Sequence, residues 1–387
     1  MRSAALVLGR NALGRRFPVR PVEEHLAGAL AWLRRAQAQT SAGGSPAYYG
    51  LLTGWAAAYP ETSGYLIPTL FAASAYADRN LRDQAIAMAD WLISLQMPEG
   101  GFPAGLARSN AAPAPSVFNS GQILLGMMAA YRETGDRRYL VAGTAAGRWL
   151  SKIQSADGSW RQHTYRNQLH SYKTRVAWAL LELYKETGEE RFHNAARKNL
   201  DWALSCQQPN GWFRYAPFWG ERAFTHTVSY VLEGLLSAGQ ILNESSYLAA
   251  VDRALESIVP LVREDGWLPG SFDSNWRPTW YCCLTGNAQL AGVMLRRFAE
   301  TGDPRYEGGG RKLLSFVKST QDLDATDPDL RGAIGGSYPV WGRYLNLCYP
   351  NWAAKFFCDS LLQELELSRK VPAQPSDREA GIAARPR

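Results

Sequence analysis

The chain of 387 residues is 46% hydrophobic and 20% charged, a composition typical of a globular protein with a sizeable core. Its apolar runs stay below the ~20 residues that a helix needs to cross a bilayer, so we expect no membrane span. The net charge of +7 comes largely from Arg-rich ends, and no helix carries a one-sided Lys/Arg cluster, which argues against binding to nucleic acid.

Both ends of the chain differ in composition from the part between them. Residues 1–20 hold five Arg and no acidic residue, and their apolar run, Ala4–Leu8, is shorter than the ~7–15 residues of a signal-peptide core. We therefore predict a flexible basic leader and a cytoplasmic protein. Residues 369–387 are rich in Pro, Arg and Ala and lack periodicity, which predicts a disordered tail.

The part between the ends is a repeat. A Trp-Leu-x-x-x-Gln motif, followed by Gly and an aromatic residue, recurs roughly every 55 residues. A period of this length indicates a repeat architecture, in which each copy is one supersecondary unit. The copies begin at Trp32, Trp91, Trp149, Trp202, Ile258 and Phe316, of which the copy at Ile258 is the weaker match.

Each copy contains two predicted helices. A long loop leads into a helix that is apolar nearly all round and should be buried, and a short charged turn with a C-capping Gly leads into an amphipathic helix. The amphipathic, outer helices are predicted at residues 21–40, 81–97, 137–155, 190–207, 245–263 and 304–321. The buried, inner helices are predicted at residues 64–79, 117–134, 174–187, 226–243, 284–301 and 351–368.

The predicted helices start with an outer one and end with an inner one, so the first must pair with the last and close a ring. We predict an all-α (α/α)6 toroid over residues 21–368, as one catalytic domain. The pattern resembles the (α/α)6 toroid superfamily, which includes six-hairpin glycosidases, sugar epimerases, polysaccharide lyases, terpenoid cyclases and lanthionine synthetase cyclases. The stretch from Gly332 to Lys355, with Gly335–Trp341 and Tyr349–Trp352, also resembles a bacterial family found alongside polysaccharide biosynthesis genes.

The long loops of such a toroid feed the N-termini of the inner helices, whose free N–H groups and positive dipole ends point at the central cavity. Polar and aromatic residues gather at these helix starts, which predicts a ligand pocket there. Glu61 at the first start and Asp273 in a loop between aromatic residues are the candidate carboxylates. Two carboxyl groups across a pocket would suit glycoside hydrolysis, one as acid and one as base.

A second chemistry uses the same region. Abstraction of a proton next to a uronic acid carboxylate would make the protein a uronate lyase or C5-epimerase, with Arg175 or Lys173 holding the carboxylate. The net positive charge favours this chemistry weakly. The proton would be moved by one of four side chains, namely His170, His226, Tyr65 or Tyr172.

Other side chains near the helix starts are candidates for substrate binding. Polar groups inside apolar inner helices cost several kcal/mol to bury unless they are paired, and sugars commonly stack on exposed aromatic rings. The alternative interpretation is structural, because polar residues before a helix often cap it and rings often cover the core. The candidates are Arg175, Tyr172, Asn287, Gln289, Trp212, Trp276, Trp341, Tyr349, Asn351 and Lys355.

Three further functions stay open. The Gln…Gly-x-Trp repeats resemble those of terpenoid cyclases, although the Asp-x-Asp-Asp motif of that family is absent. A zinc site of the lanthionine-cyclase kind would combine Cys283 and Cys348 with a His such as His226, but the Cys-His-Gly motif is missing. A non-catalytic glycan-binding toroid is the third. We predict a carbohydrate-active enzyme that cleaves glycosidic bonds in an oligo- or polysaccharide. Uronate-containing chains are candidate substrates, and we expect no metal or cofactor.

Overall fold

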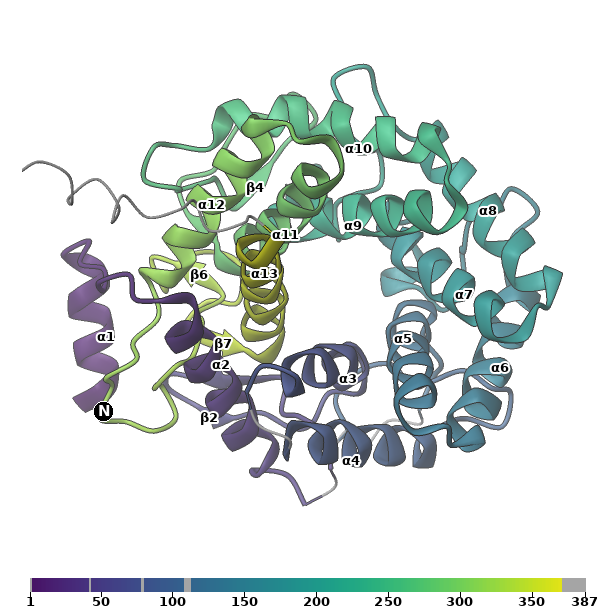
Figure 1. Ribbon diagram of the computed structural model, residues 1–387, viewed down its shortest axis with the longest axis horizontal. Coiled ribbons are helices and arrows are strands. Elements are labelled where there is room, and N and C mark those ends of the chain that lie inside the picture. The colour runs from purple at the N-terminus through teal and green to yellow at the C-terminus, as the bar shows by residue number, and fades with distance from the viewer. Residues whose placement is uncertain (1, 42, 78–79, 108–112, 371–387) are drawn as a thin grey trace, which may run out of the picture.

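The computed structural model describes residues 2–41, 43–77, 80–107 and 113–370. Within these ranges all α-helices but the first form two concentric rings, as Figure 1 shows, and the predicted (α/α)6 toroid is confirmed. The inner ring consists of α3 (Pro60–Ser74), α5 (Val117–Thr134), α7 (Thr174–Thr187), α9 (Thr225–Leu242), α11 (Leu284–Thr301) and α13 (Asn351–Lys370). The outer ring consists of α2 (Val22–Gln37), α4 (Asn80–Ser94), α6 (Arg137–Lys152), α8 (Glu190–Ser205), α10 (Ser245–Ile258) and α12 (Pro304–Lys318).

The inner helices pack on both neighbours of their ring and on the outer ring, which is why they are apolar nearly all round. The last inner helix, α13, packs against α2, α3 and α11, so the two ends of the repeat meet as predicted. Helix α3 begins at Pro60, four residues before the predicted start at 64, because proline fits the first turn of a helix, where no backbone N–H is needed.

Short strands tie the long loops together on one rim. A three-stranded sheet joins β2 (Gly54–Trp55), β1 (Tyr48–Gly50) and β7 (Cys348–Pro350), which again links the two ends of the repeat. Two pairs join β3 (Ala223–Phe224) with β4 (Ser271–Phe272) and β5 (Cys282–Cys283) with β6 (Ser337–Tyr338). Three 3₁₀ helices complete the connections, namely η1 (Tyr165–Asn167), η2 (Ser171–Lys173) and η3 (Val259–Leu261).

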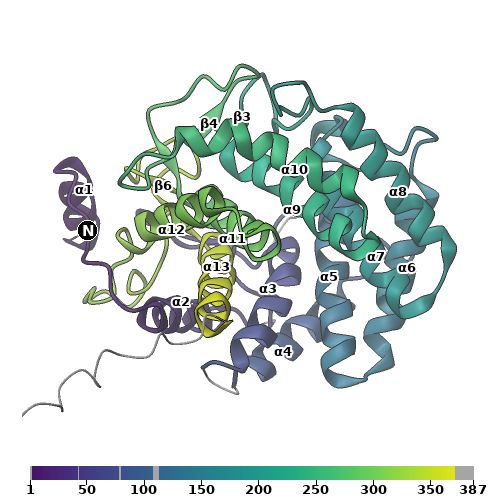
Figure 2. The same cartoon turned by 45° about the horizontal axis from the view of Figure 1, so that its top comes forward.

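The prediction of a flexible leader at residues 1–20 is wrong for most of these residues, because Arg2–Ala12 forms helix α1. This helix lies outside the ring (Figures 1 and 2). Ala4 is buried against Leu51 and Leu330, and the Asn11 side chain accepts a hydrogen bond from the Val340 N–H at 2.9 Å. The apolar run is short because the helix buries only a narrow stripe. The predicted disordered tail falls on residues 369–387, of which 371–387 lie outside the described residues, while 369 and 370 end α13.

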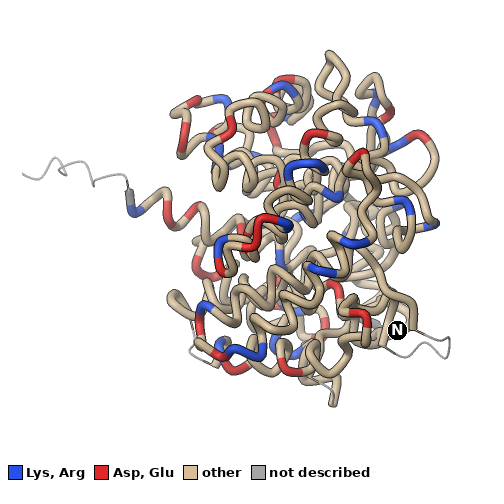
Figure 3. The backbone as a smooth tube through the Cα atoms, turned by 90° about the vertical axis from the view of Figure 1, so that its right-hand side faces the viewer, with Lys and Arg blue, Asp and Glu red and all other residues tan. Residues whose placement is uncertain are grey.

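Charged residues do not segregate by sign on the toroid. In Figure 3 Lys and Arg are interspersed with Asp and Glu over the face in view, and numerous ion pairs join them, such as Arg132 with Glu186. Among the described residues no helix is long and apolar enough to cross a membrane.

The repeated Gln has a structural role that explains the repeat. The Gln154 Nε2 donates to the carbonyl oxygen of Gly158, at 3.0 Å, and to that of Ala195 on the next outer helix, at 2.8 Å. This side chain therefore fixes its own loop and also clamps that loop to the neighbouring repeat. The same pair of bonds is made by Gln37, Gln96, Gln207 and Gln321.

The repeated Gly is the second half of this clamp. Gly158 has a φ of 87°, and a Cβ placed on it would overlap the carbonyl oxygen of Lys198 on α8. Only glycine lets the loop approach the neighbouring helix this closely. The same conformation and the same close approach to the next outer helix recur at Gly43, Gly100, Gly211, Gly266 and Gly332.

We expect Gly158→Ala to lower the free energy of unfolding by about 3 kcal/mol, since it adds a clash with backbone to an unfavourable φ. Gly188→Ala is the matched control, because Gly188 also has a positive φ, of 66°, but nothing lies within 4 Å of its added Cβ. That control should lose only about 1 kcal/mol. Equal losses in denaturant unfolding would contradict the close-packing argument.

Candidate active site

A cavity of about 1040 Å³ opens on the rim that carries the long loops, at the N-termini of the inner helices. The predicted location of the pocket agrees with this cavity. Residues from the starts of five inner helices line it, among them Glu61, Phe118, Lys173, His226 and Trp352. Of the residues that the sequence singled out, it brings together Glu61, Tyr172, Lys173 and His226.

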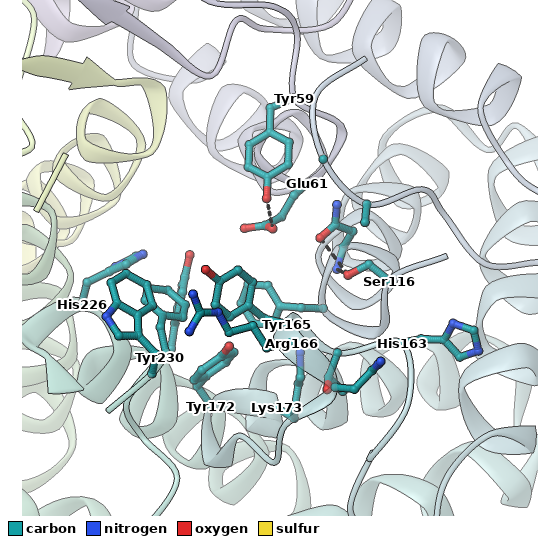
Figure 4. A pocket seen from close by; sticks show the side chains of 18 of the residues that line it. Tyr59, Glu61, Ser116, His163, Tyr165, Arg166, Tyr172, Lys173, His226 and Tyr230 are labelled. Atoms are coloured by element: carbon teal, nitrogen blue, oxygen red, sulfur yellow. Dashed lines mark hydrogen bonds between the residues drawn. The ribbon is translucent and has the colours of Figure 1, made fainter. Parts of the chain in front are cut away.

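Glu61 lies in the first turn of α3 and points into the cavity (Figure 4). The Tyr59 hydroxyl donates a hydrogen bond to its Oε2 at 2.6 Å. Burial raises the pKa of Glu61 to about 7, although this hydrogen bond and the charges of Lys173 and Arg175 oppose the shift. Near neutral pH Glu61 can therefore donate a proton.

Lys173 ends η2, just before α7, and faces Glu61 from the opposite side of the cavity (Figure 4). Its ammonium nitrogen lies 4.9 Å from the ring centre of Phe118 and 5.2 Å from that of Tyr172. Burial lowers the pKa of Lys173 to about 7, with Glu61 as an opposing influence. Near pH 7 each group is therefore close to its midpoint, so that Lys173 can accept a proton and Glu61 can donate one.

Cations and aromatic rings form the outer wall of the cavity. The Arg166 guanidinium lies 5.7 Å from the ring centre of Tyr165 and 5.9 Å from that of Trp219. Arg343 also lines the cavity. Arg166 has a φ of 56° in a loop where Asn167 also has a positive φ, strain of a kind that concentrates at functional sites. This wall can bind a carboxylate and the face of a sugar ring.

A charged network lies beneath the cavity and orients His226. Glu233 on α9 pairs with the fully buried Arg175 and accepts a hydrogen bond from the Gln289 Nε2. Burial raises the pKa of Glu233, but Arg175 and Lys355 outweigh this effect, so the pKa lies below the usual value and the group is ionised. An ionised carboxylate only accepts hydrogen bonds, so the amide nitrogen of Gln289 must face it.

The orientation of Gln289 fixes the tautomer of His226. The Gln289 Oε1 lies 3.0 Å from the His226 Nδ1, so Nδ1 carries the proton and donates it to this oxygen. Burial lowers the pKa of His226 to about 3, which keeps the ring neutral. The Nε2 lone pair is then the group that His226 offers to a ligand in the cavity.

Asp273 is not brought together with Glu61, so the predicted pair of carboxylates across one pocket does not form. Its Oδ1 accepts the backbone N–H groups of Asn275 and Arg277, both at 3.0 Å, and it lies 3.7 Å from Arg222 in a separate groove. The residue therefore closes its own loop. Sequence spacing could not show this, because the contacts depend on the turn geometry.

Two other proton-transfer candidates lie under the cavity wall. His170 is buried, and its ring nitrogens lie 3.0 Å and 3.2 Å from the carbonyl oxygens of Tyr165 and Pro217. Burial lowers the pKa of His170 to about 4. Tyr65 is buried against Phe356, with ring centres 5.6 Å apart. His170 also stacks on Tyr172, which lines the cavity, with ring centres 4.7 Å apart.

The remaining substrate-binding candidates lie outside the cavity lining. Asn351 closes the ring, since its Nδ2 lies 2.7 Å from the Pro46 carbonyl oxygen and 2.9 Å from Thr62 Oγ1. Lys355 pairs with Asp359. Trp212 and Trp276 pack edge to face, 5.3 Å apart, in the core. Asn287 is buried and lies 3.5 Å from the Gly266 carbonyl oxygen, while Gln289 is buried between Glu233 and His226. Trp341 is half-buried, and Tyr349 packs beside α1.

The cysteines named for zinc have other surroundings. The Cys283 Sγ accepts a hydrogen bond from the Gly286 N–H at the start of α11, and burial raises its pKa to about 12. Cys348 lies on β7, in a different sheet. Among the described residues no group of three or more His, Cys, Asp or Glu side chains is placed to hold a metal ion.

The sequence interpretation missed Tyr59, Arg166 and Glu233. Glu233 carried a signal, because an acid within an otherwise apolar inner helix must be paired. Tyr59 lies two residues before Glu61, in a segment already singled out. Arg166 carried no signal, since its position depends on the left-handed backbone of its loop.

Comparisons with known proteins agree with this fold. The family model described as the ulvan lyase N-terminal domain matches residues 119–285. Solved structures that resemble the chain include an unsaturated glucuronyl hydrolase specific for heparin, with a TM-score of 0.73 and 15% identity, over 90% of this chain and 98% of that one. No curated protein sequence matches the chain.

Two further solved structures carry different chemistries on the same fold. A sugar epimerase from a ruminal bacterium has a TM-score of 0.71 and 13% identity, over 90% of this chain and 98% of that one. A polysaccharide lyase has a TM-score of 0.64 and 12% identity, over 90% of this chain and 99% of that one. At these identities the likeness establishes the (α/α)6 toroid fold.

Glu61 should make stability depend on pH. Between its unfolded pKa, near 4.5, and its folded pKa, about 7, the unfolded chain loses the proton while the folded protein keeps it. The free energy of unfolding therefore falls as pH rises through this window. Glu61→Gln removes that loss. The free energy of unfolding of this variant, relative to the wild type, should therefore rise by up to about 3 kcal/mol from about pH 5 to about pH 8.

The measurement is urea unfolding at both pH values. Glu99→Gln, at an exposed loop position, serves as the control and should follow the wild type at both. If the free energies of unfolding of Glu61→Gln and the wild type differ by the same amount at both pH values, the carboxyl group is not desolvated.

The tautomer of His226 can be observed directly. Nitrogen-15 NMR of the histidine rings should show His226 protonated at Nδ1 and without titration between about pH 5 and about pH 8, since its folded pKa is about 3. The spectrum of His226→Gln assigns the signal. A proton on Nε2, or a titration in this range, would contradict the Glu233–Gln289–His226 arrangement.

Proposed function

We propose that the protein is a carbohydrate-active enzyme that cleaves a uronate-containing glycan by β-elimination, with Glu61 and Lys173 as proton-transfer groups. The observation that carries this proposal is that both side chains face one cavity and both have a pKa of about 7. The ulvan lyase match supports it, because residues 119–285 include Arg166, Lys173 and His226.

Each side chain has a definite part in the elimination. Arg166 and Arg343 bind the uronate carboxylate, and neutralising that charge acidifies the adjacent C5–H. The neutral Lys173 amine takes the C5 proton, the C4–O4 bond breaks, and the Glu61 carboxyl group gives its proton to O4. One product carries a sugar with a C4=C5 double bond, and the other ends in a new reducing-end hydroxyl group. No water is consumed. Proton exchange with solvent then restores both groups.

Hydrolysis by a pair of carboxyl groups has less support. That mechanism needs a second carboxyl group across the scissile bond. Among the described residues that line the cavity, Glu61 is the only acid, since Asp273 lies in a separate groove and Glu233 is paired with Arg175 below. Elimination needs a group that takes the C5 proton and a group that protonates O4, and the cavity lining includes Lys173 and Glu61 for these two parts.

A second candidate is hydrolysis of a sugar that already carries the C4=C5 bond. Such an enol ether needs one acid, which protonates C4, and a water molecule that adds to C5. The hemiketal formed at C5 then opens to a ketone, which leaves a free hydroxyl group on C1, and C1 releases the alcohol of the glycosidic bond. Glu61, with its pKa of about 7, can be that acid, and the resemblance to the unsaturated glucuronyl hydrolase supports the candidate. The two reactions change the double bond in opposite directions.

The test follows the ultraviolet absorbance of the conjugated double bond, together with new reducing ends, on a panel of uronate polysaccharides and on their unsaturated oligosaccharides. We expect the absorbance to rise on the polysaccharides, with a rate that is greatest near pH 7. This rate should fall at lower pH, where Lys173 gains a proton, and at higher pH, where Glu61 loses one. Lys173→Met and Glu61→Gln should each lose about 100-fold or more.

Exposed Lys185→Met and Glu99→Gln are the matched controls and should retain activity. A fall in absorbance on unsaturated oligosaccharides would establish the hydrolytic candidate instead. No change on either kind of substrate would overturn both.

A further inference from the structure

A second hollow adjoins the cavity on the same rim. This groove, of about 820 Å³, is formed by the loop before η2, the loop between α8 and β3, and the loop after β4. Trp219 lines both the cavity and the groove, so the two adjoin at this side chain. A linear ligand that fills the cavity can therefore continue into the groove.

The groove presents aromatic rings to solvent. Tyr215 is 44% exposed and lies nearly parallel to Trp202, with ring centres 5.9 Å apart and an interplanar angle of 17°. Trp219 is 48% exposed and stacks on Phe218, again 5.9 Å apart. Each exposed ring is thus stacked on a second ring, which restricts its movement. Such supported platforms suit the apolar face of a sugar ring.

The backbone at Tyr215 adopts a strained conformation. Its φ is 64°, which is rare for a bulky residue. Its carbonyl oxygen accepts the Ser171 N–H at 3.0 Å, two residues before the Lys173 amine. The loop that carries the platform is therefore anchored to the segment that carries the proposed base, which fits a binding role for the strained residue.

The groove contains arginine side chains that can bind a carboxylate of the ligand. Arg214 and Arg277 are exposed in its lining. Of the two acids there, Asp273 is occupied by its own loop and by Arg222, while Glu221 is exposed. The groove thus pairs sugar platforms with guanidinium groups, as the outer wall of the cavity does with Tyr165 and Arg166.

We propose that the groove binds further sugar units of the same uronate-containing glycan, so that the enzyme acts within a long chain and not only at a chain end. This inference rests on the proposed function and deepens it. The ligand class is an acidic polysaccharide that extends from the cavity past Trp219 and over Tyr215.

The test measures binding, so that cleavage does not obscure it. The protein with Lys173→Met is titrated with size-fractionated glucuronate-containing oligosaccharides of increasing length. We expect affinity to rise with length until the groove is filled, and Tyr215→Asn in the same background to lose about tenfold for the long ligands alone. Asparagine keeps the left-handed backbone favourable while it removes the ring. Arg214→Ala is a second variant, which leaves that backbone unchanged.

Trp280→Ala is the matched control, because Trp280 is 56% exposed but lines neither hollow. It should bind all lengths like its parent. Affinity independent of length, with no effect of Tyr215→Asn or Arg214→Ala, would overturn the inference and leave the proposed function standing. If no oligosaccharide of any length binds, the proposed function fails as well.

Discussion

The toroid depends on one contact made repeatedly, the clamp between each outer helix and the next. A glutamine amide donates to two carbonyl oxygens, one in its own loop and one in the neighbouring helix, while a glycine brings the two backbones together. The Gln321 clamp reaches the carbonyl oxygen of His25, so the last outer helix is held to the first in the same way. Where Val262 replaces the glutamine, Gly266 still makes the close approach.

The clamped ring determines the electrostatics of the site. Because the outer ring holds the inner helices side by side, their N-termini surround one cavity, and the Arg175–Glu233 pair is shut beneath its floor. The same enclosure removes water from Glu61 and Lys173 and moves their pKa values towards each other. An open stack of helices would leave both groups hydrated, with the carboxyl group ionised and the amine charged.

The repeat made the fold predictable, because its period, the polarity of its helices and the order of its first and last members together require a closed ring. The same reasoning placed the pocket at the inner-helix starts, where Glu61, Tyr172, Lys173 and His226 line the cavity. It could not separate binding from support, since Asn351 follows a loop like any ligand-binding asparagine and yet bonds to Pro46 and Thr62. The sequence pattern did not predict helix α1, because only a narrow stripe of this helix is buried.

The ring closes through residues at opposite ends of the sequence. Helix α13 fills the place between α3 and α11 and covers α2, and strand β7 pairs with β1. During synthesis, therefore, the first hairpins leave the ribosome long before their partner exists, and their apolar sides stay open until residues 348–370 emerge. Such late, non-local closure makes assembly slow and exposes the nascent chain to aggregation. A truncation that removes α13 would leave a chain with every other element present and two unmatched ends.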